Sequence, residues 1–486
     1  MTTSVRPPAA ARPDPALLRS FRDVVGDPQV LTEPDVVASY TVDWTGRFVG
    51  ATPVVVRPGS AEEVAELVAL CRDRGVAIVP QGGNTGMVGG GVPLHGEVVV
   101  SLRRLAGVGP VDAAGGQLSA QAGATLADVQ VAARDAGWAY GVDLGGRDSA
   151  TIGGNVATNA GGLRVLRYGD TRAQLLGVQA VLGNGDVVEH LGGLLKDNTG
   201  YALHSLLCGS EGTLGIVTAV RLRLVPPAPY RVAAILGVRD TASAVAAAQA
   251  LRRGLPTLSA AELMLPAGVE LVCEVTGAPL PLAGQHGAYL LVEASGTADP
   301  AGELTEAVAG LDGIEDAAVA LDPRRIAALF GYREGHTEAI NSLGVPHKLD
   351  VTLPHEVLAE TVGRLPSIVH GVAPAASVWL FGHVGDGNIH VNVTGVAPDD
   401  ERVDDAVFKA VAAVGGSISA EHGIGTAKRR WLGLNRSPAE LRAFAALKAA
   451  LDPEGIMNPH VLVDVPVTEV RAQSRIAAAN ASARSR

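Results

Sequence analysis

The first half of the chain alternates between short β-branched runs and amphipathic stretches. Residues 53–57 form such a run, and apolar residues recur at helical spacing from Val64 to Cys71. Ser60 is placed to cap that helix and Gly75 to end it, so this stretch and the next strand are predicted as a β-α-β unit. Further strands are predicted at 76–79, 98–101, 117–120, 176–182, 186–189 and 217–224. Helical segments are predicted at 16–48 and 124–136.

A proline-rich segment, Pro226-Pro227-Ala228-Pro229, can continue neither a helix nor a central strand and predicts a domain boundary. Beyond it, the β-α-β-β-α-β rhythm predicts an α+β domain with an antiparallel sheet and helices on one face. Strands are predicted at 232–238, 258–264, 288–294, 347–353, 378–383 and 389–393. Helices are predicted at 241–253, 300–311, 322–343, 355–369, 404–414 and 438–451, and the last two are expected to pack on the first domain.

Composition places the chain among globular proteins with large aliphatic cores. Hydrophobic residues make up 47% of the 486 residues, but only 3% are aromatic. The net charge of −11 argues against a nucleic-acid partner, which normally requires a basic face. The three cysteines are scattered, which favours a reducing compartment. We find no signal-peptide core and no apolar run that could span a membrane, so a cytoplasmic protein is expected.

Three glycine-rich segments, residues 80–86, 145–162 and 209–217, stand out in the first half. The first follows a predicted strand, where successive backbone N–H groups can converge on an anion. It has neither the Rossmann nor the P-loop spacing. The second carries six glycines and small polar residues, which suits close passage along an extended ligand. Each segment alone could be a plain turn, but together they indicate a cofactor site.

A cluster of metal-ligand residue types lies near the C-terminus. His383 and His390 flank a Gly-Asp-Gly-Asn turn, and Glu421-His422 follow some thirty residues later. Two histidines and one carboxylate suit a catalytic divalent metal with an open coordination position. His422 would then be free to move a proton. His390 and Asn392 are two apart on a predicted strand, so their side chains face the same way.

In these segments the chain resembles the FAD-binding PCMH-type enzymes of the vanillyl-alcohol-oxidase superfamily. The C-terminal cluster is similar to the D-2-hydroxyacid dehydrogenase branch, which includes enzymes that oxidise D-2-hydroxyglutarate, D-lactate and glycolate. The resemblance covers residues 30–464. It implies an α+β protein with a two-subdomain FAD-binding domain, a ferredoxin-like antiparallel-sheet substrate domain and a C-terminal helical segment. The implied limits are 1–29 for an N-terminal arm, 30–226, 230–420, 421–464 for a segment returning to the flavin domain, and 465–486 for a flexible tail.

The resemblance also implies which residues meet the cofactor. Its FAD-binding positions correspond to Gly82, Gly83, Asn84, Thr85, Gly86, Ser149, Gly153, Asn155, Ala157, Glu211, Gly215 and Val217. Some relatives tether the flavin through a histidine in the first glycine loop. This chain has Asn84 there, which favours non-covalent FAD.

The resemblance further assigns the substrate and metal residues. His383, His390 and Glu421 correspond to ligands of zinc or a similar divalent ion, and His422 to the general base. The substrate-binding positions are Arg333, Thr337, Lys348, Asn392 and His422. Arg333 and Thr337 are four apart, on one face of a predicted helix. Two cations suit a substrate with one or two carboxylates.

We therefore expect an FAD- and metal-dependent D-2-hydroxyacid dehydrogenase, with D-2-hydroxyglutarate as the first choice and D-lactate or glycolate as alternatives. A metal-dependent hydrolase would use the same histidines and glutamate but leave the glycine segments without a role. A flavin-binding subunit without catalysis is a third class. An external electron acceptor is required in the expected function, its identity is open, and a homodimer is kept open as the oligomeric state.

Overall fold

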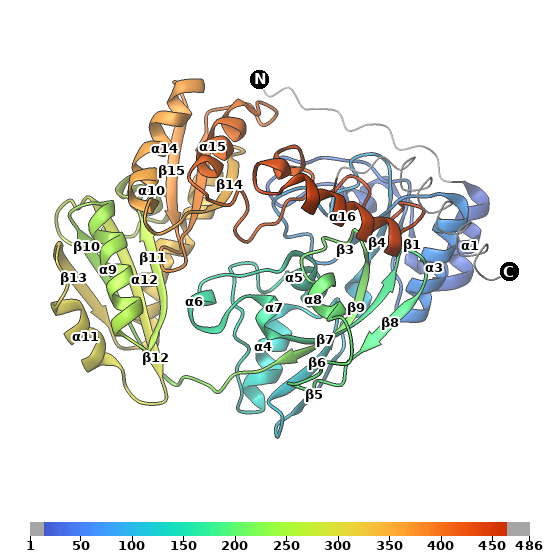
Figure 1. Ribbon diagram of the computed structural model, residues 1–486, viewed down its shortest axis with the longest axis horizontal. Coiled ribbons are helices and arrows are strands. Elements are labelled where there is room, and N and C mark those ends of the chain that lie inside the picture. The colour runs from blue at the N-terminus through green and yellow to red at the C-terminus, as the bar shows by residue number, and fades with distance from the viewer. Residues whose placement is uncertain (1–13, 464–486) are drawn as a thin grey trace.

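The computed structural model describes residues 14–463 and contains three β-sheets (Figure 1). The predicted tail at 465–486 lies outside the described residues, as does the start of the N-terminal arm. The first sheet has the order β1-β2-β4-β3, with β1 at Val30–Leu31, β2 at Val55–Val56, β4 at Val98–Ser101 and β3 at Ile78–Gln81. Strands β2 and β3 both pair in parallel with β4. The predicted β-α-β unit is therefore present, with a later strand between its two strands.

Helix α3 (Ala61–Arg74) connects β2 and β3 and has the predicted ends. The hydroxyl of Ser60 accepts the N–H of Glu63, and Gly75 ends the helix with a φ of 63°, a left-handed conformation that glycine adopts without strain. The prediction of a helical lead-in over 16–48 is wrong beyond Val25. Helix α1 (Pro15–Val25) stops at Gly26, and β1 and the short α2 (Pro34–Val37) follow.

The second sheet is antiparallel and shares one hydrophobic core with the first. Its order is β5 (Val108–Asp112), β6 (Gln117–Gln121), β9 (Gly215–Arg223), β7 (Leu175–Leu182) and β8 (Val187–His190). Its helices are α4 (Leu126–Asp135), α5 (Ile152–Thr158), α6 (Val165–Tyr168), α7 (Thr171–Gln174) and α8 (Leu203–Leu207). Thr125 and Asp128 form a capping box at the start of α4, which fixes that helix after β6.

The third sheet begins just after the proline-rich segment and has the order β13-β10-β12-β11-β15-β16-β14, antiparallel throughout. The strands are β10 (Tyr230–Val238), β11 (Leu258–Met264), β12 (Ala288–Gly296), β13 (Ile314–Ala320), β14 (His347–Thr352), β15 (Ser377–Gly382) and β16 (Asn388–Thr394). The helices are α9 (Thr241–Gly254), α10 (Pro266–Thr276), α11 (Ala301–Ala309), α12 (Pro323–Glu334), α13 (His336–Asn341), α14 (Leu358–Val372), α15 (Arg402–Ala413) and α16 (Pro438–Leu451).

Helices cover both faces of the third sheet, so the prediction of helices on one face is wrong. Ala234 of β10 belongs to the core under α9, while its neighbour Ile235 belongs to a second core with Val269 of α10 and Phe330 of α12. Because both faces are apolar, the central strands β11 and β12 are buried along their whole length and show no alternation that would reveal a solvent face.

The two C-terminal helices, α15 and α16, pack on different parts of the protein. Helix α15 packs on α14 and contributes Phe408 to the core of the third sheet, so its expected packing on the first domain is wrong. Helix α16 instead lies over the N-terminal part of the chain (Figure 1). There the Lys448 ammonium donates to the carbonyl oxygen of Thr213 at 2.6 Å. Beyond α16, the Ile78 amide donates to the carbonyl of Ile456 at 2.8 Å, which fixes the returning segment beside β3.

Candidate active site

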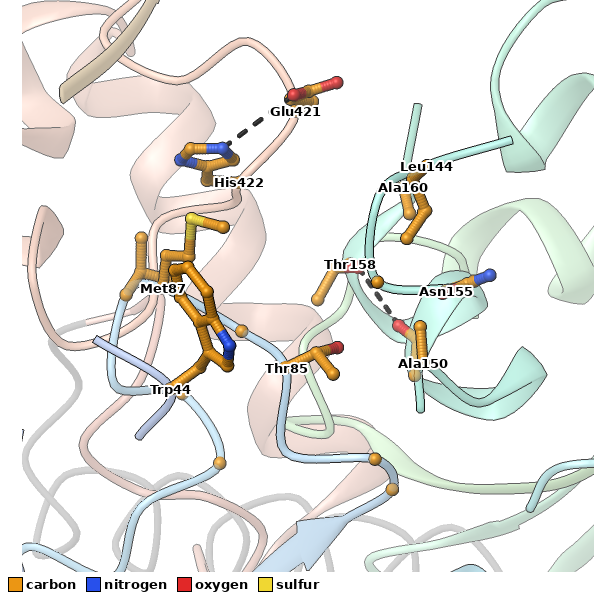
Figure 2. Close-up of a pocket in the computed structure, with 18 of the residues that line it drawn as sticks. Trp44, Thr85, Met87, Leu144, Ala150, Asn155, Thr158, Ala160, Glu421 and His422 are labelled. Atoms are coloured by element: carbon orange, nitrogen blue, oxygen red, sulfur yellow. Dashed lines mark hydrogen bonds and ion pairs between the residues drawn. The ribbon is translucent and has the colours of Figure 1, made fainter. Parts of the chain in front are cut away.

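A cavity of about 730 Å³ is lined on one side by loops of the first two sheets and on the other by residues of the third sheet and its helices. All three glycine-rich segments line it, together with the histidine and glutamate cluster. Figure 2 shows Glu421 and His422 on one side of the cavity and Thr158 and Ala160 of the second glycine segment across from them. A volume of this size fits a cofactor and a small substrate together.

The first glycine loop is held open by its neighbours. Asn84 has a left-handed φ of 55°, and its amide donates to the carbonyl of Val42 at 2.8 Å. A Cβ on Gly83 would lie 1.9 Å from the carbonyl oxygen of Ser149, so only glycine fits there. The first and second segments therefore pack backbone to backbone. Ser149 itself is exposed and, unlike the other eleven cofactor positions proposed from the sequence, is not among the residues that line the cavity.

The second glycine segment contains α5, whose N-cap Thr151 accepts the N–H of Gly154. Gly153 lies against Ala122, where a Cβ would be 2.6 Å from the alanine methyl carbon. The Nδ2 of Asn155 is buried at the cavity and has no hydrogen-bond partner among the described residues. A buried amide without a partner is costly, so this donor fits a bound group with acceptor atoms.

The third segment ties the cavity to the returning C-terminal segment. Glu211 has a left-handed φ of 52°, and its carboxylate accepts the N–H groups of Ile424 and Gly425 at 2.8 and 2.6 Å. Burial raises the pKa of Glu211 above its usual value, although these two amides lower it. The Glu211 carboxylate thus orders the loop after His422, and residues 210–212 line the cavity.

The two sequence-predicted histidines converge on one carboxylate. His383 follows β15 and His390 lies on β16, and their ring centroids are 5.4 Å apart. The Nε2 atoms of His383 and His390 lie 3.8 and 3.5 Å from the two carboxylate oxygens of Glu421. Their Nδ1 atoms face other carboxylates, Glu262 at 2.7 Å and Asp350 at 3.7 Å. The contact between His383 and Glu262 is a hydrogen bond of the kind by which an outer carboxylate orients an imidazole in metal sites, while Asp350 faces His390 from a longer distance.

The protonation states of His383, His390 and Glu421 suit the binding of a cation between them. Burial alone would lower the pKa of His383, but the carboxylates of Glu262 and Glu421 raise it to about 10. Burial lowers the pKa of His390 to about 3, so that ring is neutral. Burial would raise the pKa of Glu421, but His383 and His390 bring it down to about 2. A divalent ion bound here would take the place of the proton on His383.

Asp350, on β14, was not identified from the sequence. One of its oxygens accepts the backbone N–H groups of Ala420, Glu421 and His422 at 2.9, 2.8 and 2.9 Å. Lys428 lies 3.8 Å from the same oxygen, and both residues are buried. Ligand atoms of Asp350, His390, Glu421 and His422 all lie within 4.8 Å of one another. Because the Asp350 oxygen already accepts three amides, we interpret it as the group that orders the loop carrying Glu421 and His422.

His422 stands beside this cluster, with its Nε2 at 3.8 Å from a Glu421 oxygen and its ring stacked on that of His390 at 5.5 Å between centroids. Its Nδ1 is buried without a hydrogen-bond partner among residues 14–463. The imidazole lines the cavity, so it can exchange a proton with a bound molecule.

The predicted substrate residues also line the cavity: Arg333, Thr337, Lys348 and Asn392. The Arg333 Nε donates to Glu262 at 2.7 Å, and its guanidinium lies 4.6 Å from the centroid of Phe381. Lys348 is different, because the only hydrogen bond of its side chain among the described residues is a 3.4 Å contact to the Asn392 side-chain oxygen. Burial lowers the pKa of Lys348 to about 8. Glu262, Phe381 and Trp44 were not predicted as site residues from the sequence, because only the tertiary structure brings them to the site.

Comparison with known proteins decides the family. The profile "FAD binding domain" matches residues 52–190, and "FAD linked oxidases, C-terminal domain" matches residues 228–462. The D-2-hydroxyglutarate dehydrogenase of Bos taurus, described as mitochondrial, is 39% identical over 450 residues, which cover 90% of this chain and 81% of that protein. The chain belongs to the D-2-hydroxyglutarate dehydrogenase family. It is an FAD-dependent 2-hydroxyacid dehydrogenase that acts on CH–OH donors.

Other relatives of this family place the chain in the same way. The D-2-hydroxyglutarate dehydrogenase of Xanthomonas citri pv. viticola is 36% identical, over 93% of this chain and 97% of that protein. The D-2-hydroxyglutarate–pyruvate transhydrogenase of Saccharomyces cerevisiae is 34% identical, over 91% and 93%. The match to a dehydrogenase family removes the metal hydrolase and the non-catalytic flavin-binding protein as alternatives.

Solved structures confirm the predicted fold class. p-Cresol methylhydroxylase with bound substrate superposes with a TM-score of 0.75 at 17% identity, over 92% of this chain and 96% of that chain. Alkyldihydroxyacetonephosphate synthase superposes with a TM-score of 0.73 at 17% identity, over 94% and 87%. Within the part of the chain that the structure describes, no helix has both the length and the apolar character needed to cross a bilayer.

Proposed function

We propose that this dehydrogenase oxidises a D-2-hydroxyacid with a second carboxylate, D-2-hydroxyglutarate first, to the 2-oxo acid with the help of a divalent metal ion. The observation that carries the choice is Lys348, a buried ammonium in the cavity without a carboxylate partner among the described residues. A buried charge is unfavourable unless it is paired. A second substrate carboxylate would pair it, whereas D-lactate or glycolate, the alternatives, would leave it unpaired.

The cofactor is proposed to bind without a covalent link along the glycine segments. The backbone N–H groups of 82–86 would face its pyrophosphate, because they follow β3 in an open loop that lines the cavity. Asn155 would donate its free amide N–H to an acceptor on the same group. When bound, FAD supplies a hydride acceptor for the C2 hydrogen of the substrate.

The proposed metal ligands are the Nε2 atoms of His383 and His390 and the carboxylate of Glu421, and zinc is the first choice. The hydrogen bond between His383 Nδ1 and Glu262 supports this assignment because it fixes the orientation of that ring, and the Asp350 carboxylate faces Nδ1 of His390 at 3.7 Å. When bound, such an ion lowers the pKa of a substrate hydroxyl.

His422 is proposed as the base. Its imidazole lines the cavity and would take the proton of the C2 hydroxyl, while the ion pair of Asp350 and Lys428 holds its backbone in place. Arg333, with Thr337, would hold the carboxylate next to C2. The Glu262 contact fixes the Arg333 guanidinium, whose planar shape suits a carboxylate.

We also propose the domain limits 30–226, 230–420 and 421–464. The switch from the shared core of the first two sheets to that of the third, between β9 and β10, supports the first boundary. The external electron acceptor and a homodimer stay predictions. The compartment stays a prediction too, because the relatives include a mitochondrial enzyme of an animal and an enzyme of a bacterium.

The test is a panel of D- and L-2-hydroxyacids, assayed with a dye acceptor on protein of known flavin and metal content. The proposal predicts that kcat/KM is highest for D-2-hydroxyglutarate and that its L isomer is inactive. A higher kcat/KM for D-lactate than for D-2-hydroxyglutarate would contradict the substrate choice.

A further inference from the structure

Trp44 is a large aromatic side chain left 44% exposed on the wall of the active-site cavity. It belongs to a short loop of the N-terminal part, closed by an isolated bridge between Val42 and Val49. Figure 2 shows the indole on the same side of the cavity as His422, facing the glycine segment that contains Asn155. An exposed indole inside a cavity, rather than on the outer surface, indicates contact with a bound molecule.

The Trp44 loop is fixed to the opposite part of the molecule. Both terminal nitrogens of Arg47 lie 3.2 Å from one oxygen of Asp404, and its Nε donates to the carbonyl of Pro398 at 3.0 Å. The other Asp404 oxygen lies 2.5 Å from Nδ1 of His347. His347 directly precedes Lys348 on β14. The contacts of Asp404 with both Arg47 and His347 therefore set the position of the loop relative to the strand that carries Lys348.

The loop position places the Trp44 indole beside the Lys348 ammonium. The Lys348 Nζ lies 5.7 Å from the centroid of a Trp44 ring, within the range of a cation–π interaction. No carboxylate among the described residues lies within ion-pair distance of Lys348. We propose that Trp44 is a specificity-determining residue: its indole covers Lys348 and completes a subsite for the second carboxylate of the substrate. The inference rests on the proposed function, because it assigns the determinant of dicarboxylate preference.

The physical reason is exclusion of water. An indole over Lys348 keeps the ammonium poorly hydrated, so a carboxylate that reaches it gains a strong charge-assisted hydrogen bond. A substrate without that carboxylate leaves the ammonium buried and unpaired. Removing the indole hydrates Lys348 whether or not substrate is bound, which weakens the dicarboxylate and leaves the monocarboxylate nearly unaffected.

The test compares Trp44→Ala and Trp44→Phe with the wild type, using D-2-hydroxyglutarate and D-lactate in turnover and 2-oxoglutarate and pyruvate in calorimetric binding. Trp44→Ala is expected to lose about tenfold in kcat/KM for the dicarboxylate, mostly through KM, and about twofold or less for D-lactate. Trp44→Phe keeps an aromatic face and should retain most of the preference. Arg47→Met, which frees the loop, should shift the same ratio in the same direction as Trp44→Ala.

Trp138, which packs beside Gly116 in the turn between β5 and β6 and does not line the cavity, provides the control, and Trp138→Phe should leave kcat/KM for both substrates unchanged. Equal losses for both acids in Trp44→Ala, or loss of bound flavin in that variant, would overturn the inference and place the indole against the cofactor. Wild-type protein that binds 2-oxoglutarate more tightly than pyruvate yet does not oxidise D-2-hydroxyglutarate would contradict the proposed function alone. Equal binding of the two oxo acids would overturn the role of Trp44.

Discussion

One carboxylate oxygen of Asp350 accepts the backbone N–H of His422 at 2.9 Å. A strand of the third sheet thereby fixes a loop that lies 72 residues later in the chain. The same oxygen accepts the amide of Glu421, so one buried carboxylate orders both the proposed ligand and the proposed base. The carboxylates of Glu421 and Asp350 would repel each other, but the neutral ring of His390 lies between them and the Lys428 ammonium lies beside Asp350.

Asp350→Asn should therefore reduce turnover without removing the flavin. The amide would turn a donor toward Asn388, whose Nδ2 already donates to Asp350 at 2.8 Å, and would leave Lys428 without its counter-ion. Breaking such a buried pair costs about 3 kcal/mol or more in the free energy of unfolding. Denaturant unfolding and flavin absorbance measure the two effects. In the double variant Asp350→Asn/Lys428→Met, stability should recover while turnover stays low, and recovery of both would contradict the ordering role.

His422→Gly should keep bound flavin and lose about 10²- to 10⁴-fold in the rate of flavin reduction by substrate, the usual contribution of a general base. Added imidazole should restore part of that rate, because the freed space lies on the cavity wall. His355, which does not line the cavity, offers the matched control His355→Gly. Reduction at the wild-type rate in His422→Gly would show that another group takes the proton.

Lys348 predicts a pH dependence of substrate affinity. Burial lowers its pKa to about 8, so the ammonium is charged below that pH and becomes neutral above it. KM for a dicarboxylate should therefore rise as the pH passes about 8, while KM for D-lactate changes little. Lys348→Arg, whose guanidinium stays charged, should remove this rise from the KM profile. A rise of equal size for both acids would exclude Lys348 as its source.

Substitutions at two glycines of the first loop should distinguish an effect on protein stability from an effect on FAD binding. Gly83→Ala would place a methyl group 1.9 Å from the Ser149 carbonyl, so it should lower the thermal stability of the flavin-free protein. Gly86→Ala meets no described atom within 4 Å and should leave that stability unchanged while weakening FAD binding. Gly192→Ala, equally open and outside the cavity lining, is the control and should change neither. Unchanged FAD affinity in Gly86→Ala would contradict its proposed place beside the cofactor.

Local signals account for the part of the fold that could be predicted. The helix from Ala61 to Arg74 has a hydroxyl cap at Ser60 and a glycine at its end, and both act within one turn of the helix. Helix α10 and strand β13 were not predicted, although the exposed and half-buried residues of β13 alternate along the strand. The packing of α15 on α14 depends on contacts between two helices that strands β15 and β16 separate in the sequence, which no local pattern records.

The residues of the candidate site also fall into two groups, those that could be predicted from the sequence and those that could not. His383, His390 and Glu421 could be proposed because their residue types and spacing match a metal site, and the structure brings them together. Glu262 is 121 residues from the histidine that it orients, and Asp350 is 72 residues from His422. Such partners are set by strand pairing, in this case by β14 with β16 and β11 with β15, and pairing cannot be read from one sequence.

We propose that substrate oxidation at this cavity requires a divalent ion held by His383, His390 and Glu421. The most direct test mixes flavin-loaded, metal-stripped protein with D-2-hydroxyglutarate without oxygen and follows the visible absorbance of oxidised flavin. We predict that the absorbance persists in the stripped protein, falls when zinc is restored, and persists despite zinc in His383→Ala. Bleaching at the same rate before and after metal removal would contradict the requirement for a divalent ion.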